Sequence, residues 1–200
     1  MNKKILLVML AVLLIVPASV FASGLFGLRI GPAAMYLFER DAEDELIIPE
    51  LGDITKEDLR FGVDARLNLT ILEGNVLALM DKSESGGEAY WTITTYANAG
   101  ISFRLFPFFR LGVFAGPKFD IYYSAEDGFD LDGVPDVDGI LGGGVNIKVS
   151  GDFAIGKLSL STFGIAETNV KFEELGDSGL DELFTSPKVS VGASVLFNIF

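Results

Sequence analysis

The chain has 200 residues, enough for one domain, and a formal net charge of −13. This acidic balance argues against nucleic-acid binding, which needs a basic surface. The sequence contains no histidine and no cysteine, so Ser–His catalysis lacks its base, zinc lacks its usual ligands, and no disulfide framework can form. We therefore expect a protein that is not an enzyme.

Residues 1–22 have the pattern of an export signal that is cleaved off. Lys3 and Lys4 form a basic start, and an unbroken apolar run follows over residues 5–16. Such a run is shorter than the roughly 17–25 residues that a membrane-spanning helix needs. Small side chains before the cleavage point predict cleavage after Ala22, and no cysteine follows that could carry a lipid anchor.

The remaining residues, 23–200, alternate apolar and polar side chains with the two-residue period of strands that have one apolar face. The alternation predicts eight strands, at residues 25–38, 59–72, 76–82, 91–105, 109–123, 140–149, 153–165 and 188–200. Short turns are expected at Gly74-Asn75, Phe106-Pro107 and Gly151-Asp152. In the seventh strand the apolar phase slips, which indicates a bulge near Gly156-Lys157.

The fourth and fifth strands are long enough to cross a membrane. The twelve steps from Trp91 to Phe103, at about 3.3 Å each and tilted by about 45°, climb about 28 Å. The lipid-facing band of an outer-membrane barrel is about 25 Å tall. Aromatic residues at the ends of both strands predict two interfacial girdles. Their members are Tyr90, Trp91, Tyr122 and Tyr123 at one end, and Phe103, Phe106 and Phe109 at the other. A soluble β-sandwich explains neither the strand length nor the girdles.

Long polar connections alternate with short turns along the chain. The long ones are residues 39–58, 83–88, 124–139 and 166–187. Together with an even strand number, this layout predicts an all-β fold, an eight-stranded antiparallel transmembrane up-and-down β-barrel closed by its first and last strands.

On this architecture and on its terminal Phe200, the chain resembles the small OmpA/OmpX-type outer-membrane barrels. The resemblance implies a place in the outer membrane of a diderm bacterium, surrounded by outer-membrane lipid, with both termini in the periplasm. It also implies that the outer-membrane insertion machinery recognises Phe200.

Charged residues on the inward phase fall into two groups. An eight-stranded barrel is just wide enough for its own side chains to fill it, so we expect a lumen charge network. Its predicted members are Arg60, Asp64, Arg66, Lys118 and Asp120. A basic cluster is expected toward the short-turn, periplasmic end, where no acid faces it. It consists of Arg29, Arg104, Arg110 and Lys148. This cluster either reaches periplasmic water or binds an anion.

Acidic residues crowd the long connections, either as a solvated surface or as a site for cations or partners. A weak candidate for a Ca²⁺ site is the set Asp130, Asp132, Asp136 and Asp138. No other cofactor is expected. The sequence thus favours a barrel whose acidic extracellular loops serve envelope structure, surface interaction or adhesion. The alternative is a narrow channel, or a small-ligand uptake barrel, that uses the basic lumen.

Overall fold

The computed structural model describes residues 26–38, 46–47, 49, 54, 58–85, 88–124, 141–168 and 187–199. They form eight strands: β1 (Phe26–Leu37), β2 (Leu59–Leu69), β3 (Leu72–Ser85), β4 (Glu88–Phe106), β5 (Phe109–Ser124), β6 (Leu141–Ile155), β7 (Leu158–Glu167) and β8 (Lys188–Asn198). None of the described residues forms a helix with the length and hydropathy to cross a bilayer. The predicted export signal and Phe200 lie outside the described residues, so the signal and its cleavage point stay predictions.

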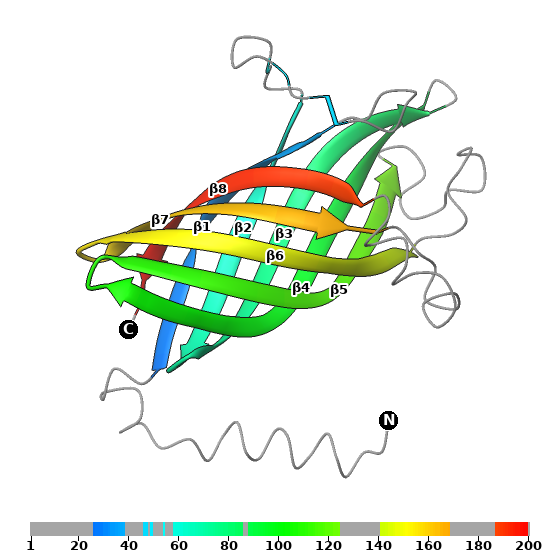
Figure 1. The fold of residues 1–200 in the computed structure, drawn as a ribbon. Helices are drawn as coiled ribbons and strands as arrows, with labels where there is room; N and C mark the ends of the chain where they lie inside the picture. Colours follow the sequence, from blue (N-terminus) through cyan, green and yellow to red (C-terminus); the bar gives the residue numbers. More distant parts are fainter. Residues whose placement is uncertain are drawn as a thin grey trace.

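The strands form one closed barrel (Figure 1). Each strand pairs antiparallel with the next one along the chain, and β1 pairs with β8 to complete the ring. Tyr36 in β1, for example, lies opposite Leu59 in β2 and opposite Val191 in β8. The predicted eight-stranded up-and-down barrel is confirmed. The β-sandwich alternative is excluded, because closure leaves no strand at an edge.

All three short turns differ from the predicted positions, two of them by four or five residues and the third by one. Thr70 and Ile71 join β2 to β3, so the predicted turn at Gly74-Asn75 is wrong and these two residues belong to β3. Thr70 has φ 59°, the left-handed conformation that tight turns often require. The signal was the change of apolar phase at the adjacent Ile71 and Leu72, which ends one alternating run and begins another.

The turn between β6 and β7 lies further along the chain than predicted. Gly156 and Lys157 form it, and Gly156 adopts φ 64°. The predicted turn at Gly151-Asp152 is therefore wrong, and so is the predicted bulge near Gly156-Lys157. Gly151 lies inside β6, whose apolar phase continues without a break to Ile155. The third turn, Pro107-Phe108 between β4 and β5, is one residue from its predicted position.

The outer face of the barrel is apolar along each strand. Large exposed side chains follow the outward phase, among them Ile30, Phe61, Val63, Val76, Ile101, Val113, Val149, Leu160 and Val195. A soluble monomer rarely exposes a contiguous apolar patch larger than a few hundred Å². An apolar outer face around a closed barrel is the surface of a protein that spans a lipid bilayer with strands.

The inside of the barrel is filled with side chains. One group on β1, β3 and β7 is apolar and packs together, with Met35, Leu77, Leu79 and Ile165 at most 1% exposed. Most of the other buried side chains are polar or charged. The barrel therefore has apolar side chains outside and mostly polar ones inside, the reverse of a soluble protein, and its charged interior is a candidate functional site.

Candidate functional site

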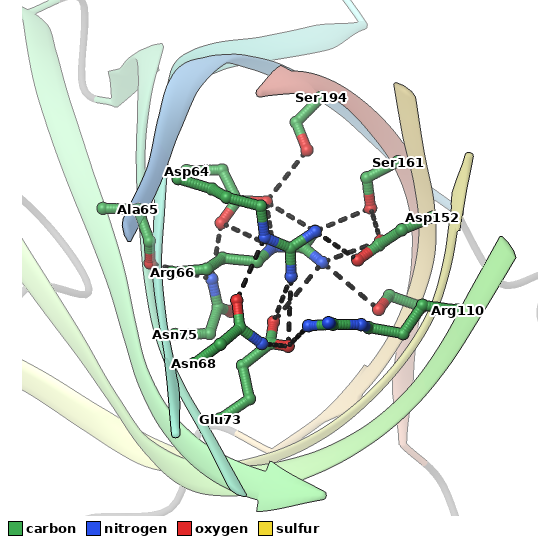
Figure 2. A network of polar contacts seen from close by, with 12 residues as sticks. Asp64, Ala65, Arg66, Asn68, Glu73, Asn75, Arg110, Asp152, Ser161 and Ser194 are labelled. Atoms are coloured by element: carbon green, nitrogen blue, oxygen red, sulfur yellow. Dashed lines mark hydrogen bonds and ion pairs between the residues drawn. The ribbon is translucent and has the colours of Figure 1, made fainter. Parts of the chain in front are cut away.

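Arg66 is the centre of a charged network inside the barrel (Figure 2). Its guanidinium donates to Asp64 on the same strand, with 2.7 Å between Nη2 and Oδ2. Across the lumen it donates to Asp152 Oδ1 on β6 at 2.8 Å and to Ser161 Oγ on β7 at 2.7 Å. Arg66 is only 1% exposed, so these contacts replace its hydration almost completely.

Asp64 is fully buried and receives contacts from four strands. Besides Arg66 it accepts hydrogen bonds from Asn75 on β3 and from Ser194 on β8. The ammonium of Lys148, on β6, lies 3.6 Å from Asp64 Oδ2 and donates to Asn75 Oδ1 at 2.8 Å. Lys148 Nζ also lies 4.4 Å from the centre of the Phe163 ring, in a cation–π contact.

The network continues toward the short-turn end through Arg29. Its Nη1 donates to Asp152 Oδ2 at 2.7 Å, and its Nη2 donates to both carboxylate oxygens of Glu73 at 3.1 Å. Asn68 also donates to Glu73. Arg110 reaches the same carboxylate at 3.5 Å. This network includes side chains of seven strands and leaves out those of β4 among the described residues.

A second polar cluster, which includes β4, lies in the half of the barrel nearer the long loops. Lys118 Nζ lies 2.9 Å from Glu167 Oε1 and 3.2 Å from Asp120 Oδ2. The Tyr96 hydroxyl donates to Glu167, and the Thr94 hydroxyl donates to Asp120 Oδ1 at 2.7 Å. The two clusters join strands that are distant around the ring, and together they occupy the lumen with fixed, paired charges.

The structure divides the predicted lumen network between three places. Asp64 and Arg66 lie in the central network, whereas Lys118 and Asp120 lie in the second cluster. Arg60 pairs with Asp81 instead, at 3.2 Å, where both side chains are partly exposed.

The expectation that no acid faces the basic cluster of the short-turn end is wrong. Arg29 contacts Glu73 and Asp152, and Lys148 lies deep in the central network beside Asp64. Arg104 and Arg110 do lie at the short-turn end, directly opposite each other across β4 and β5.

Three acids of the lumen are not among its predicted members, because each falls in or beside a predicted turn or loop. Glu73 lies beside the predicted turn at Gly74-Asn75, and Asp152 belongs to the predicted turn at Gly151-Asp152. Glu167 falls in the last predicted long loop. All three occupy inward positions of strands that extend further than predicted. The continuing alternation, Ser150 then Asp152 between apolar neighbours, was the available signal.

The aromatic residues lie near the two ends of the apolar belt. Trp91 and Tyr123 are cross-strand partners at the long-loop end, each 38% exposed. At the short-turn end Phe106 stacks on Phe108, and Phe153 contacts both Phe108 and Phe109. Phe103 is exposed on the outward face of β4.

The prediction that Tyr122 belongs to an interfacial girdle is wrong. Tyr122 shares the inward phase of Lys118 and Asp120 on β5. The side chain of Tyr90 lies outside the described residues.

The weak Ca²⁺ candidate, Asp130, Asp132, Asp136 and Asp138, also lies outside the described residues. Among the residues that are described, no group of three or more potential metal ligands is arranged to hold an ion. The described lumen carboxylates instead accept from arginine, lysine, asparagine and hydroxyl donors, so they form internal ion pairs and hydrogen bonds.

A closed eight-stranded antiparallel barrel with an apolar outside and a filled, charged lumen has the architecture of a small membrane-spanning β-barrel. A solved structure supports this fold: Ail, the attachment invasion locus protein of Yersinia pestis, has a TM-score of 0.51 and 10% sequence identity. The match covers 87% of this chain and 97% of that one. No protein-family model matches the chain, and no curated protein matches it in sequence. At such low identity the similarity concerns the fold.

Proposed function

We propose that the protein is a non-enzymatic outer-membrane barrel whose extracellular loops are its working surface. The filled lumen supports this most strongly, because Arg66 and Lys148 are almost completely buried among paired charges in the described part of the barrel. Function is then left to the loops, which carry most of the acidic residues of the sequence. Ail, which is similar in fold, is described as the attachment invasion locus protein.

The proposed orientation follows from the connections. In bacterial outer-membrane barrels the short turns face the periplasm and the long loops face outward. β1 begins and β8 ends at the short-turn end, where Arg29 lies opposite Asn198 (Figure 1). Both termini are therefore proposed to be periplasmic, with Phe200 available to the insertion machinery.

The acidic loops are proposed to bind basic surfaces of other molecules, or Ca²⁺ at the third long loop. Carboxylates attract cationic partners over about a Debye length, roughly 8 Å at physiological salt. Neutralising Asp130, Asp132, Asp136 and Asp138 to Asn should therefore weaken binding of vesicles that carry the protein to immobilised polylysine. Added salt should weaken the binding of the unaltered protein in the same way.

The matched control replaces the same four residues by Glu, which keeps the charge but changes the ligand geometry. Binding that survives in the Glu variant supports electrostatic capture of a partner. A rise in the melting temperature of the unaltered protein with Ca²⁺ that is lost in the Glu variant supports the metal site, because Ca²⁺ depends on the arrangement of its oxygens. Equal binding by all three proteins would contradict a role for this loop.

The alternative function, a narrow channel, is tested by single-channel recording of the refolded protein in planar bilayers. We expect no steady openings, because an eight-stranded barrel has space only for its own side chains. Steady ion-selective openings that weaken when Arg66 or Arg110 is replaced would contradict the closed barrel and favour the channel.

A further inference from the structure

The mouth of the barrel at the short-turn end contains a basic cavity that the lumen network does not neutralise. It has a volume of about 320 Å³, within the range of about 300–1,000 Å³ of ligand pockets. Three arginines line it, Arg29, Arg104 and Arg110, together with one acid, Asp152. Asn68 and Ser159 add polar groups to its wall.

The acids near this cavity are already occupied. Asp152 accepts from Arg29, Arg66 and Ser161. Glu73 accepts two hydrogen bonds from Arg29 and one from Asn68, and Arg110 approaches it only at 3.5 Å. Arg29 and Arg66 thus use most of the negative charge within reach, and little remains for the outer arginines.

Arg104 and Arg110 form a pair of like charges, in which only Arg110 has a carboxylate nearby, Glu73 at 3.5 Å. They are direct cross-strand partners on the inward phase, which brings their Cβ atoms to about 4.5–5.5 Å and is unfavourable for two cations. Arg104 has no carboxylate within ion-pair distance among the described residues. Arg110 does not simply extend into water, since its side chain is only 20% exposed. An anion between them would relieve their repulsion.

We propose that this mouth binds a phosphate group, held by the guanidinium groups of Arg104 and Arg110 with Arg29 behind them. The planar fork of arginine matches phosphate oxygens with two parallel hydrogen bonds. Phe108 and Phe109 line the same cavity, and such aromatic side chains mark the level of lipid headgroups in a membrane. The phosphate comes either from a phospholipid headgroup of the inner leaflet or from the periplasm as a free ion.

The test uses the refolded full chain in an uncharged maltoside detergent. Two probes are titrated by calorimetry: inorganic phosphate, and a short-chain phosphatidic acid with the matching diacylglycerol as its phosphate-free control. Arg104→Gln combined with Arg110→Gln should weaken binding by about 10- to 100-fold, the worth of a charge-assisted hydrogen bond. Arg60→Gln, at the opposite mouth, should leave the affinity unchanged.

The outcomes separate the two sources. Binding of both probes indicates a site for phosphate itself, and binding of phosphatidic acid alone indicates a headgroup site. If neither probe binds, or if binding is the same in the double variant, the proposal is overturned.

A second measurement covers the case in which the double variant folds poorly. Arg104→Gln alone removes an exposed side chain without a carboxylate partner among the described residues, so the barrel should still fold. Phosphate should raise the urea midpoint of the unaltered protein, because a ligand that binds only the folded state stabilises it. The same rise in Arg104→Gln as in the unaltered protein would overturn the proposal.

Discussion

Replacement of Arg66 by alanine should lower the free energy of unfolding by about 3–5 kcal/mol, the usual cost of removing one partner of a buried ion pair. The side chain is inaccessible to solvent and lies within ion-pair distance of Asp64, Asp152 and Glu73. Without it, Lys148 at 3.6 Å is the one cation that remains near Asp64 among the described residues. The large effect is a cost of uncompensated charge and not a measure of how much the intact network stabilises the barrel.

Reversible urea unfolding in lipid vesicles measures this loss, and Trp91, the single tryptophan of the sequence, reports on it by fluorescence. Arg60→Ala is the matched control, because its pair with Asp81 is partly exposed and should contribute about 0–1 kcal/mol. The loss of stability in Arg66→Lys should lie between those of the two alanine variants, since lysine keeps the charge but cannot make the forked contacts of arginine. Equal losses for Arg66→Ala and Arg60→Ala would contradict a central role of Arg66.

The outside of the barrel could be predicted from the sequence because lipid imposes one simple requirement. Each outward position must be apolar, so a two-residue period over β2, β4 and β5 identifies strand and face together. The closed ring follows from the same requirement, since an open edge cannot exist in hydrocarbon.

The inside could be predicted only in part, because its contacts depend on how the strands are staggered around the ring. Arg29 and Asp152 are 123 residues apart, and no local pattern indicates that they meet. Which residues of β3 face the lipid could not be predicted for a different reason. Val76, Leu77, Ala78, Leu79 and Met80 are apolar on both faces, so the run does not distinguish lipid-facing from lumen-facing positions.

The interior of the barrel also contains apolar side chains, which an expectation of a purely charged lumen does not include. Met35, Leu77 and Leu79 pack against one another inside the barrel, beside the charged groups. Because these buried side chains are apolar, they lower the local dielectric constant, which strengthens the electrostatic interactions of nearby ion pairs. The same packing is consistent with a filled barrel and leaves the mouth at the short-turn end as an accessible polar surface among the described residues.

An arginine on the outer face should be costly in proportion to its depth in the bilayer. Val63 lies at the middle of β2, is 47% exposed, and faces outward between Pro32 of β1 and Ala78 of β3. Val63→Arg should lower the free energy of unfolding in vesicles by about 2–4 kcal/mol, the cost found for arginine at the bilayer midplane. Leu59→Arg, on the same face at the long-loop end, should cost only about 0–1 kcal/mol.

The two variants compare two depths directly, because the introduced arginine, the strand and the face of the barrel are the same in both. A large loss at Val63 with a small one at Leu59 requires a hydrocarbon layer centred on the middle of β2. In a soluble barrel, or in one held in water by a partner, both arginines would reach solvent and the two losses would be equally small. Equal losses at the two positions would therefore contradict a membrane-spanning barrel, whatever the loops and the lumen do.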